Sequence, residues 1–355
     1  MKVLFISNDP TMFDSTSAVR MRLRAYAAVL GEVHAISVAP GHTNDVHEGA
    51  LHLYPIQASR LLRIPALARR ARVLIRERGI EVVSAQDPFE HGLIAWKAVL
   101  GTNARLHIQL HTDPFARDFA NVGHPMSYIN FVRLLIMSFV LRRAARIRVV
   151  SARLAREMRE RYHPRAPITI LPIYTDLARF RSVVRAREQG SLLWIGRFEK
   201  EKNPMLALAA LAAVRSIGID AHLTLLGAGR LELPLRLRAK ELGVDTHVTF
   251  PGFVDPLPYL AKAELVLATS LYEGYGLAIV EALAAGVPVL STDVGIAREV
   301  GALIPSGESY AAALSAWFAH GPREGHLTSY PYASFDDYVS AYAADIQATA
   351  RLSTP

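Results

Sequence analysis

Two glutamates eight positions apart, Glu273 and Glu281, enclose the stretch Gly-Tyr-Gly-Leu-Ala-Ile-Val. The apolar run at 265–268 leads into this stretch and predicts a strand, so Glu273 is expected on a loop at the carboxyl edge of a sheet, where open α/β sheets bind ligands. Gly274 and Gly276 allow the backbone to approach a ligand and to direct amides at it. Carboxylates accept hydrogen bonds from hydroxyl groups, and amides at a helix N-terminus hold phosphate. The pattern therefore predicts a ligand that carries both groups.

This segment resembles the Glu-x7-Glu motif of retaining glycosyltransferases with the GT-B architecture, in particular glycosyltransferase family 4. The Ala-Gly-Val-Pro-Val run after the second glutamate matches as well, and so does Gly295. The resemblance implies that Glu281 holds the ribose hydroxyls of a nucleotide diphosphate sugar. It implies that Glu273 and the amides of Gly276 and Leu277 hold the donor sugar. The donor-binding residues implied on this segment also include Gly274 and Tyr275.

A second element of positive charge lies between a strand predicted to end at Gly196 and a predicted helix. Arg197 and Lys202 stand five positions apart there. The guanidinium offers a fork of donors and the ammonium a point charge, a combination that suits a diphosphate. The element is similar to the Gly-Arg-x4-Lys motif of family 4, whose cations bind the donor pyrophosphate. Because Glu199 and Glu201 could neutralise these cations, a solvated run of charges is the alternative interpretation.

Two further turns are expected along the nucleotide. Gly227 and Gly229 follow a predicted strand in a Gly-x-Gly loop, which lacks the third glycine and the acidic residue of a dinucleotide fingerprint. The resemblance places this loop against the nucleotide and the turn at Phe253 and Val254 beside the base. Phe253 could stack on the base there, and a phenylalanine of the core is the alternative.

In the N-terminal half, His111 follows a predicted strand. A structural histidine is one interpretation. The resemblance implies instead a histidine that contacts the hydroxyls of the reacting sugar and the charge developing at its anomeric carbon, with Asp113 as a contact to the acceptor. The family usually carries a Gly-Gly loop after the first strand, and this chain does not. Amides and hydroxyls at a predicted helix N-terminus could still bind phosphate there, on Ser15, Thr16 and Ser17.

Short apolar runs alternate with helical patterns along both halves of the chain, which predicts parallel sheets covered by helices on both faces. The expected fold class is α/β with the GT-B architecture, in which two doubly wound Rossmann-like domains face each other across a cleft. We expect domains at 1–172 and 190–330, joined by an Arg-rich linker at 172–190. The resemblance implies acceptor binding by the first domain, nucleotide-sugar binding by the second, and a last helix at 335–350 that packs back on the first.

The amino-acid composition of the chain excludes several classes of function. The chain has 355 residues and no cysteine, which excludes disulfides, thiolate catalysis and Cys-ligated zinc. No apolar run reaches the roughly 20 residues of a membrane span, and residues 1–7 predict a first strand rather than a signal peptide, so a cytoplasmic location is expected. Residues 1–187 hold 28 Lys and Arg against 14 Asp and Glu, a net of +14, whereas residues 188–355 hold 12 against 18, a net of −6. This asymmetry predicts an anionic partner for the first half.

The basic residues concentrate in a predicted helix near 60–78. They alternate with leucine and isoleucine, a pattern that suits an anionic membrane surface. A solvated helix is the alternative, and nucleic acid is disfavoured because no zinc-finger spacing or RNA-binding aromatic signature occurs. A peripheral position on the cytoplasmic face of the membrane is therefore one expectation. The positions concerned are Arg60, Arg63, Arg69, Arg70, Arg72, Arg76 and Arg78.

The sequence contains no Asp-x-Asp triplet, which metal-dependent GT-A transferases use to hold a cation on the diphosphate. We therefore expect no metal site for catalysis and no cofactor besides the nucleotide sugar as co-substrate. The resemblance implies a retaining transfer of a hexose from a GDP- or UDP-linked donor to a glycan or lipid-linked acceptor, in glycan, glycolipid or polysaccharide synthesis. Two alternatives remain open: a nucleotide-sugar 2-epimerase of GT-B fold, and a non-catalytic peripheral membrane protein that binds nucleotide sugars.

Overall fold

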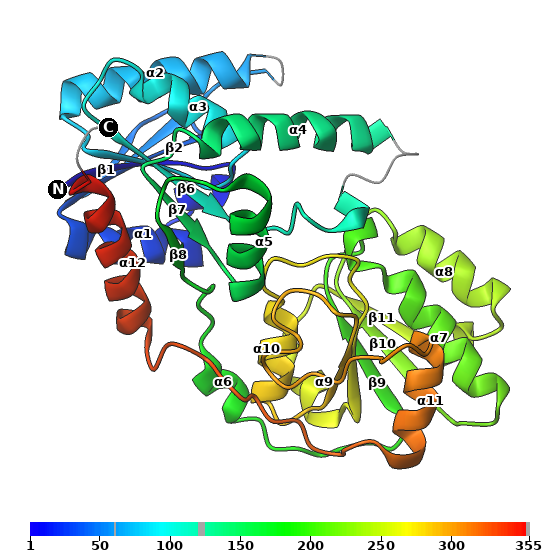
Figure 1. Cartoon of the computed structure of the whole chain (residues 1–355). Helices are drawn as coiled ribbons and strands as arrows, with labels where there is room; N and C mark the ends of the chain where they lie inside the picture. The colour runs from blue at the N-terminus through cyan, green and yellow to red at the C-terminus, as the bar shows by residue number, and fades with distance from the viewer. Residues whose placement is uncertain (60–61, 120–124, 353–355) are drawn as a thin grey trace. The chain divides into compact units, whose positions relative to one another are not determined.

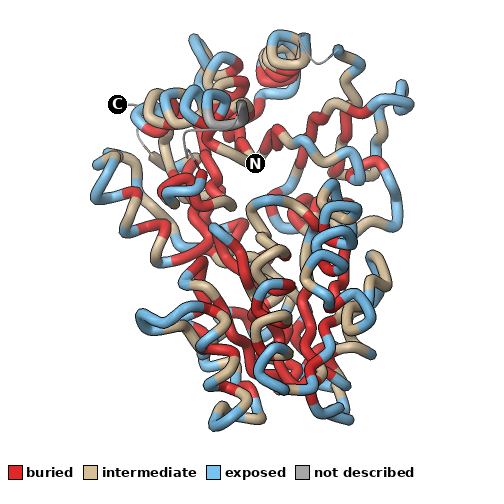
Figure 2. The backbone as a smooth tube through the Cα atoms, turned by 90° about the vertical axis from the view of Figure 1, so that its right-hand side faces the viewer, coloured by how far each residue is buried: buried red, intermediate tan, exposed pale blue. Residues whose placement is uncertain are grey.

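The computed structural model describes residues 1–59, 62–119 and 125–352. The chain divides into two compact units, each with its own sheet (Figure 1). Unit 1 comprises Met1–Pro172 and Tyr332–Pro355, and unit 2 comprises Ile173–Pro331. In both units the buried segments concentrate in the strands, drawn red in Figure 2.

The sheet of unit 1 has eight strands within the described residues, in the order β3-β4-β2-β1-β5-β6-β7-β8. All neighbours are parallel except β3, which runs antiparallel to β4 at the edge. Strands buried on both faces need nearly continuous apolar runs, and β1 is an example. The bounds are β1 Lys2–Ile6, β2 Glu32–Val38, β3 Val46–Glu48, β4 Leu51–Ile56, β5 Val82–Ala85, β6 Arg105–Leu110, β7 Arg146–Val149 and β8 Ile168–Ile170.

Helices cover both faces of this sheet. Helices α1 and α12 lie side by side on one face, and α2, α3 and α4 lie on the other (Figure 1). The helix N-terminus predicted near Ser17 is confirmed, since the Ser17 hydroxyl caps α1 by accepting from the Arg20 amide at 3.1 Å. The bounds are η1 Pro10–Phe13, α1 Ala18–Leu30, α2 Arg63–Arg78, α3 Glu90–Val99, η2 Arg117–Phe119, α4 Pro125–Leu141, α5 Ala152–Tyr162 and α12 Phe335–Ala350.

Helix α12 belongs to unit 1, although the whole of unit 2 precedes it in the chain. Its carboxylate Asp345 is buried and accepts from His107 at 3.0 Å and from Arg146 at 2.6 Å. Burial alone would raise the pKa of Asp345, but the contacts with His107 and Arg146 hold it at about 2. Nearby, the Tyr342 hydroxyl accepts from the Gln109 amide at 2.8 Å. Polar groups of the sheet therefore depend on α12 for their partners.

Unit 2 has five parallel strands within the described residues, in the order β11-β10-β9-β12-β13. The order reverses between β9 and β12, the switch point at whose carboxyl edge such sheets bind ligands. The bounds of the strands are β9 Ser191–Ile195, β10 His222–Leu226, β11 Val248–Gly252, β12 Leu265–Ala268 and β13 Val289–Ser291. The bounds of the helices are α6 Leu177–Arg181, η3 Lys200–Lys202, α7 Pro204–Ser216, α8 Glu232–Glu241, η4 Asp245–His247, α9 Leu257–Lys262, α10 Leu277–Ala284 and α11 Tyr310–His320.

The prediction of a linker at 172–190 is wrong, because nearly all of this segment is folded into unit 2. It contains α6, whose Leu177 and Phe180 are buried. Farther along, the Ala186 amide donates to the Ala261 carbonyl at 2.8 Å. The arginines that suggested a solvated connection surround these apolar positions, so composition alone concealed the packing.

The basic helix α2 differs from the expectation of a membrane-facing surface. Its apolar side chains are buried in unit 1, namely Leu67, Ala71, Leu74 and Ile75. Two of its arginines are engaged within the unit: Arg70 pairs with Asp45 at 3.1 Å, and Arg72 donates to the Lys97 carbonyl at 3.3 Å. Arg60 lies outside the described residues. Among the described helices, none is long and apolar enough to cross a membrane.

Candidate functional site

The loops that follow β9 and β12 are bonded to each other at the switch point of unit 2. The Leu271 amide donates to the Glu201 carbonyl at 2.8 Å. The Thr269 hydroxyl donates to the Asn203 carbonyl at 2.9 Å and accepts from the Trp194 indole at 2.9 Å. These bonds hold the cationic loop and the Glu273 loop side by side. Sequence reasoning did not single out Thr269, because its role depends on a contact between loops.

Lys202 and Glu273 form an ion pair across these loops. Both side chains are largely buried, with 23% and 17% of their surfaces exposed. Glu273 also accepts from the Ser270 hydroxyl at 2.8 Å. Arg197 differs, because its side chain is 71% exposed and pairs with Glu201 at 2.7 Å. The two predicted cations therefore lie on one loop, and each is paired with a carboxylate.

The loop that carries Glu273 leads directly into the N-terminus of α10. Gly276 is its N-cap in a left-handed conformation (φ 103°), and no side chain caps the first turn. Gly295 backs this loop so closely that a Cβ there would lie 2.2 Å from the Tyr275 carbonyl oxygen. The Ile296 amide donates to the same oxygen at 3.0 Å. The segment around Gly295 and Ile296 thus packs against Tyr275 and fixes the backbone just before Gly276 and Leu277.

Glu281 lies about one turn into α10. Its carboxylate accepts from the Thr175 hydroxyl at 3.1 Å, and Thr175 is held in turn by Tyr330, whose hydroxyl accepts from the Thr175 amide at 2.7 Å. Burial raises the pKa of Glu281 to about 7, against a smaller lowering by the Thr175 hydrogen bond. Thr175 was not predicted as a site residue. The only signal in the sequence was that Pro-Ile-Tyr-Thr-Asp at 172–176 stands where the family commonly has a Pro-Asn-Gly turn.

This pKa leads to a prediction about donor binding. A carboxylate must be ionised to accept from both ribose hydroxyls. As the pH falls below about 7, a growing fraction of Glu281 becomes protonated. We therefore expect the Kd for a nucleoside diphosphate to increase by roughly tenfold for each pH unit below that pKa. Calorimetric titrations at several pH values test this. Glu281→Gln should bind weakly without this pH dependence, and the same dependence in both proteins would contradict the role.

The Gly-x-Gly loop packs against the start of the cationic loop. A Cβ added at Gly227 would lie 1.8 Å from the carbonyl oxygen of Gly196. A Cβ added at Gly229 would lie 2.6 Å from the carbonyl oxygen of Phe198. Between the glycines, the Ala228 carbonyl accepts from the Phe198 amide at 2.9 Å. Glycine is therefore required at both positions for close approach of the two loops.

The turn after β11 presents its side chains to solvent. Phe253 is 91% exposed and Val254 is also exposed. The alternative interpretation of Phe253 as a core residue is therefore wrong. An exposed aromatic ring at the carboxyl edge of the sheet is available for stacking on a planar ligand.

His111 lies at the carboxyl end of β6 in unit 1. Its Nε2 atom lies 3.2 Å from Gln109 Oε1, which also accepts from Arg148 at 2.6 Å. Burial first, and then the charges of Arg148 and Arg22, lower the pKa of His111 to about 3. Its imidazole is therefore neutral at neutral pH.

Asp113 is buried, and its carboxylate supports the turn that follows β6. Its Oδ1 atom accepts from the Phe115 amide at 2.9 Å, and Arg153 lies 4.0 Å from Oδ2. Burial raises the pKa of Asp113, against smaller lowering by the Phe115 amide and Arg153. The structure thus places this residue within a turn rather than at an open surface.

At Thr16 and Ser17, the groups expected to bind phosphate before α1 already have partners. Asp14 accepts from the Thr16 amide at 2.9 Å and from its hydroxyl at 2.8 Å. The Ser17 hydroxyl caps α1, and the Ser17 amide donates to the Asp14 carbonyl at 3.2 Å. Because a phosphate here would face the Asp14 carboxylate, this arrangement argues against the predicted phosphate contact.

Two family models match the chain. Residues 189–320 match the model described as "Glycosyl transferases group 1", and residues 20–179 match "Glycosyltransferase Family 4". Together they cover most of both units.

Curated relatives and solved structures agree with these models. A glycogen synthase of Mycobacterium tuberculosis is 31% identical over 45% of this chain and 40% of its own length. A GDP-mannose-dependent alpha-(1-6)-phosphatidylinositol dimannoside mannosyltransferase of the same species is 31% identical over 41% and 40%. These alignments thus span less than half of each relative.

Solved structures are similar to this protein over nearly the whole chain. A sucrose-phosphate synthase from Thermosynechococcus elongatus has a TM-score of 0.73 at 19% identity, covering 98% of this chain and 94% of its own. Anabaena HepE in complex with UDP and glucose has a TM-score of 0.66 at 18% identity, covering 99% and 94%. At these identities the likeness concerns the fold.

Proposed function

This chain belongs to the group 1 glycosyltransferases of family 4, and from that premise we propose that it transfers a hexose from a nucleotide diphosphate sugar to an acceptor hydroxyl with retention of configuration. The observation that carries this proposal is the Lys202–Glu273 pair beside the N-terminus of α10, at the switch point of unit 2. It combines a cation for the diphosphate, a carboxylate for sugar hydroxyls and helix amides. The donor is GDP- or UDP-linked.

The diphosphate would replace the two carboxylates that are now paired with the cations. Arg197 would turn from Glu201, and Lys202 from Glu273, toward the phosphates, leaving the Glu273 carboxylate for the sugar hydroxyls. As the bond between the anomeric carbon and the phosphate oxygen breaks, both cations stabilise the charge gained by the leaving group. The acceptor oxygen attacks the same face, and its proton passes to a phosphate oxygen, so no nucleophile on the protein is needed.

The neutral state of His111 suits the role that the family resemblance implies for it. Positive charge develops at the anomeric carbon in such a transfer, and an imidazolium would oppose it. A neutral imidazole can hydrogen-bond to a sugar hydroxyl without that repulsion. The pKa of about 3 keeps His111 neutral throughout the working range of pH.

We expect transfer to persist in excess chelator. The sequence lacks an Asp-x-Asp triplet, and Arg197 and Lys202 can supply the positive charge that a divalent cation supplies elsewhere. Initial rates with and without chelator, taken well below the melting temperature, test this. Loss of activity that added magnesium or manganese restores would contradict a metal-independent mechanism.

A lipid-linked acceptor remains part of the proposal, and the membrane contact then depends on the charges of α2 and not on its apolar side chains. The apolar face of α2 is buried, so any attraction of this helix to an anionic surface must come from its exposed arginines, such as Arg69 and Arg76. Helix α4 instead exposes apolar side chains, namely Tyr128, Ile129, Phe131, Val132 and Leu135.

We expect weak, salt-sensitive binding to anionic vesicles. Each basic residue near such a surface contributes about 1 kcal/mol, and salt screens the attraction over about 8–10 Å. Arg69→Glu/Arg76→Glu should therefore lose most of the binding in co-sedimentation. The matched control, Arg236→Glu/Arg238→Glu on α8 of unit 2, should retain it. Failure of the wild type to sediment at low salt would favour an acceptor free in solution.

A panel of nucleotide sugars tests the function itself. The true donor should raise the melting temperature, because it binds the folded state alone, and should be turned over when acceptors are added. Conversion of the nucleotide sugar without any acceptor would select the epimerase instead. Tight binding without turnover toward any acceptor or water would select the non-catalytic role.

A further inference from the structure

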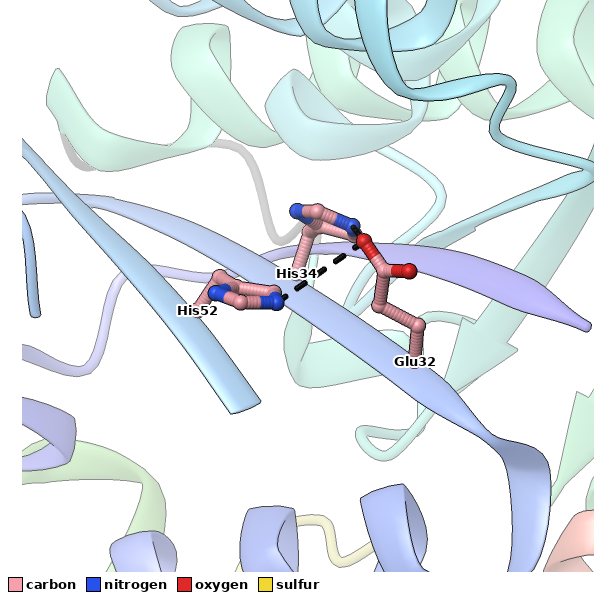
Figure 3. A group of neighbouring side chains, drawn as sticks. All are labelled: Glu32, His34 and His52. Atoms are coloured by element: carbon pink, nitrogen blue, oxygen red, sulfur yellow. Dashed lines mark hydrogen bonds and ion pairs between the residues drawn. The ribbon is translucent and has the colours of Figure 1, made fainter. Parts of the chain in front are cut away.

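A glutamate and two histidines converge near the edge of the unit 1 sheet (Figure 3). Glu32 and His34 are two positions apart on β2, so both side chains lie on one face, and the strand register sets His52 of β4 opposite His34. Glu32 Oε1 lies 2.8 Å from His34 Nε2 and 3.7 Å from His52 Nε2. Ligands of a tetrahedral metal with bonds of about 2.0 Å lie roughly 3.3 Å apart. The observed distances bracket that spacing.

The remaining atoms of these groups are held by a second set of partners. His34 Nδ1 lies 3.0 Å from the Tyr54 hydroxyl, and His52 Nδ1 lies 2.9 Å from His47 Nδ1. Such partners on the far ring nitrogen are typical of metal-binding histidines, because they fix the tautomer and the ring orientation. The second oxygen of Glu32 pairs with the Lys2 ammonium at 3.0 Å. Both Nε2 atoms thus remain, and both face the same oxygen of Glu32 (Figure 3).

A metal ion binds a neutral imidazole through the ring nitrogen that carries no proton. In the tautomer with both protons on Nδ1, the two Nε2 lone pairs would face Glu32 Oε1, and three acceptors would meet there without a donor. A cation between them satisfies all three.

We propose that Glu32, His34 and His52 form a binding site for a divalent transition metal, with zinc as the ion that suits this donor set. Two imidazoles and a monodentate carboxylate are common zinc ligands, and a water molecule would complete a tetrahedron. The absence of cysteine excludes zinc sites with cysteine ligands but not a site made of histidine and glutamate.

The place of the site in the fold indicates a structural role. Glu32 and His34 lie at the start of β2, whereas His111 lies at the carboxyl end of β6, so the metal site is at the amino edge of the same parallel sheet. A metal there joins β2 to β4, next to the short edge strand β3. Its removal should lower stability and leave the chemistry of transfer intact.

The experiment uses the untagged full chain, loaded with zinc and dialysed against metal-free buffer. We expect one tightly held zinc per chain by mass spectrometry of the metal, a higher melting temperature in the loaded protein, and tetrahedral absorption bands with cobalt in its place. Glu32→Gln and His52→Asn, which avoid the fully buried His34, should each lose the cobalt bands while keeping the native circular dichroism. Tyr54→Phe, which removes only a partner of His34, should weaken binding about 10–100-fold.

A second cluster, Asp220, His222 and His247 in unit 2, provides the matched control. His222→Asn should leave the metal content and the cobalt bands unchanged. The proposal is overturned if the wild type takes up no zinc, if the Glu32 and His52 variants bind as the wild type does, or if His222→Asn removes the metal. A cluster held together by hydrogen bonds alone, with His34 donating to Glu32, would give the first of these results. None of these readouts depends on the transferase activity.

Discussion

Lys202→Ala is expected to lower kcat by about 10²–10³-fold, the loss typical when a preorganised group that stabilises developing charge is removed. Its ammonium is partly buried, so once it exchanges Glu273 for the leaving diphosphate it acts where solvent screens its charge little. Arg197→Ala removes a more exposed group, whose charge solvent screens more strongly, and we expect a loss toward the lower end of that range. Steady-state kinetics with the identified donor measure both effects.

Lys200→Ala is the matched control, because it removes the same charge from the same short helix at an exposed position. Its kcat should stay close to that of the wild type. Removing Lys202 also leaves the largely buried Glu273 without its ion-pair partner, at a cost in stability of about 1–3 kcal/mol. Thermal unfolding should therefore accompany the kinetics. Unchanged turnover in folded Lys202→Ala and Arg197→Ala proteins would remove the diphosphate clamp from the mechanism.

Gly295→Ala should reduce kcat/KM by about 10²-fold, although the residue makes no proposed contact with the substrate. The new Cβ would lie 2.2 Å from the Tyr275 oxygen and 3.2 Å from Glu273 Cβ. Because no Cβ tolerates such a contact, the loop that carries Glu273 and Gly276 has to move. Misplacement of positioning groups by about 1 Å is enough for a loss of this size.

Gly286→Ala separates this effect from simple backbone strain. Gly286 also has a positive φ, of 75°, but a Cβ there would meet nothing within 4 Å. Both variants should lose about 1–2 kcal/mol of stability through the left-handed conformation. Only Gly295→Ala should lose activity beyond that. Equal activity in the two variants would show that the loop tolerates displacement.

Local sequence patterns predicted most of the elements and the candidate motifs. The strand before Glu273, the helix after it and the final helix at 335–350 follow from local patterns of apolar residues and from breaks in them. Helix α11 was not predicted, because its alanine-rich sequence has only a weak polar face. Strands β3 and β4 were missed because histidines and Pro55 interrupt their apolar alternation.

Contacts between distant segments could not be predicted in the same way. The pairing of Lys202 with Glu273 depends on how two loops meet, and that of Glu281 with Thr175 depends on a turn more than a hundred positions away. The approach of His52 to His34 depends on strand register. Sequence periodicity specifies the face of an element that is buried, but not the residue that lies opposite.

The return of α12 to unit 1 has a consequence for the order of events during synthesis. Residues 335–350 leave the ribosome after all of unit 2, so the sheet of unit 1 must wait with His107, Gln109 and Arg146 lacking their partners on this helix. Unit 2, whose residues are contiguous, can fold in the meantime. A nascent chain released just before α12 would therefore pair a finished unit 2 with an open, aggregation-prone unit 1.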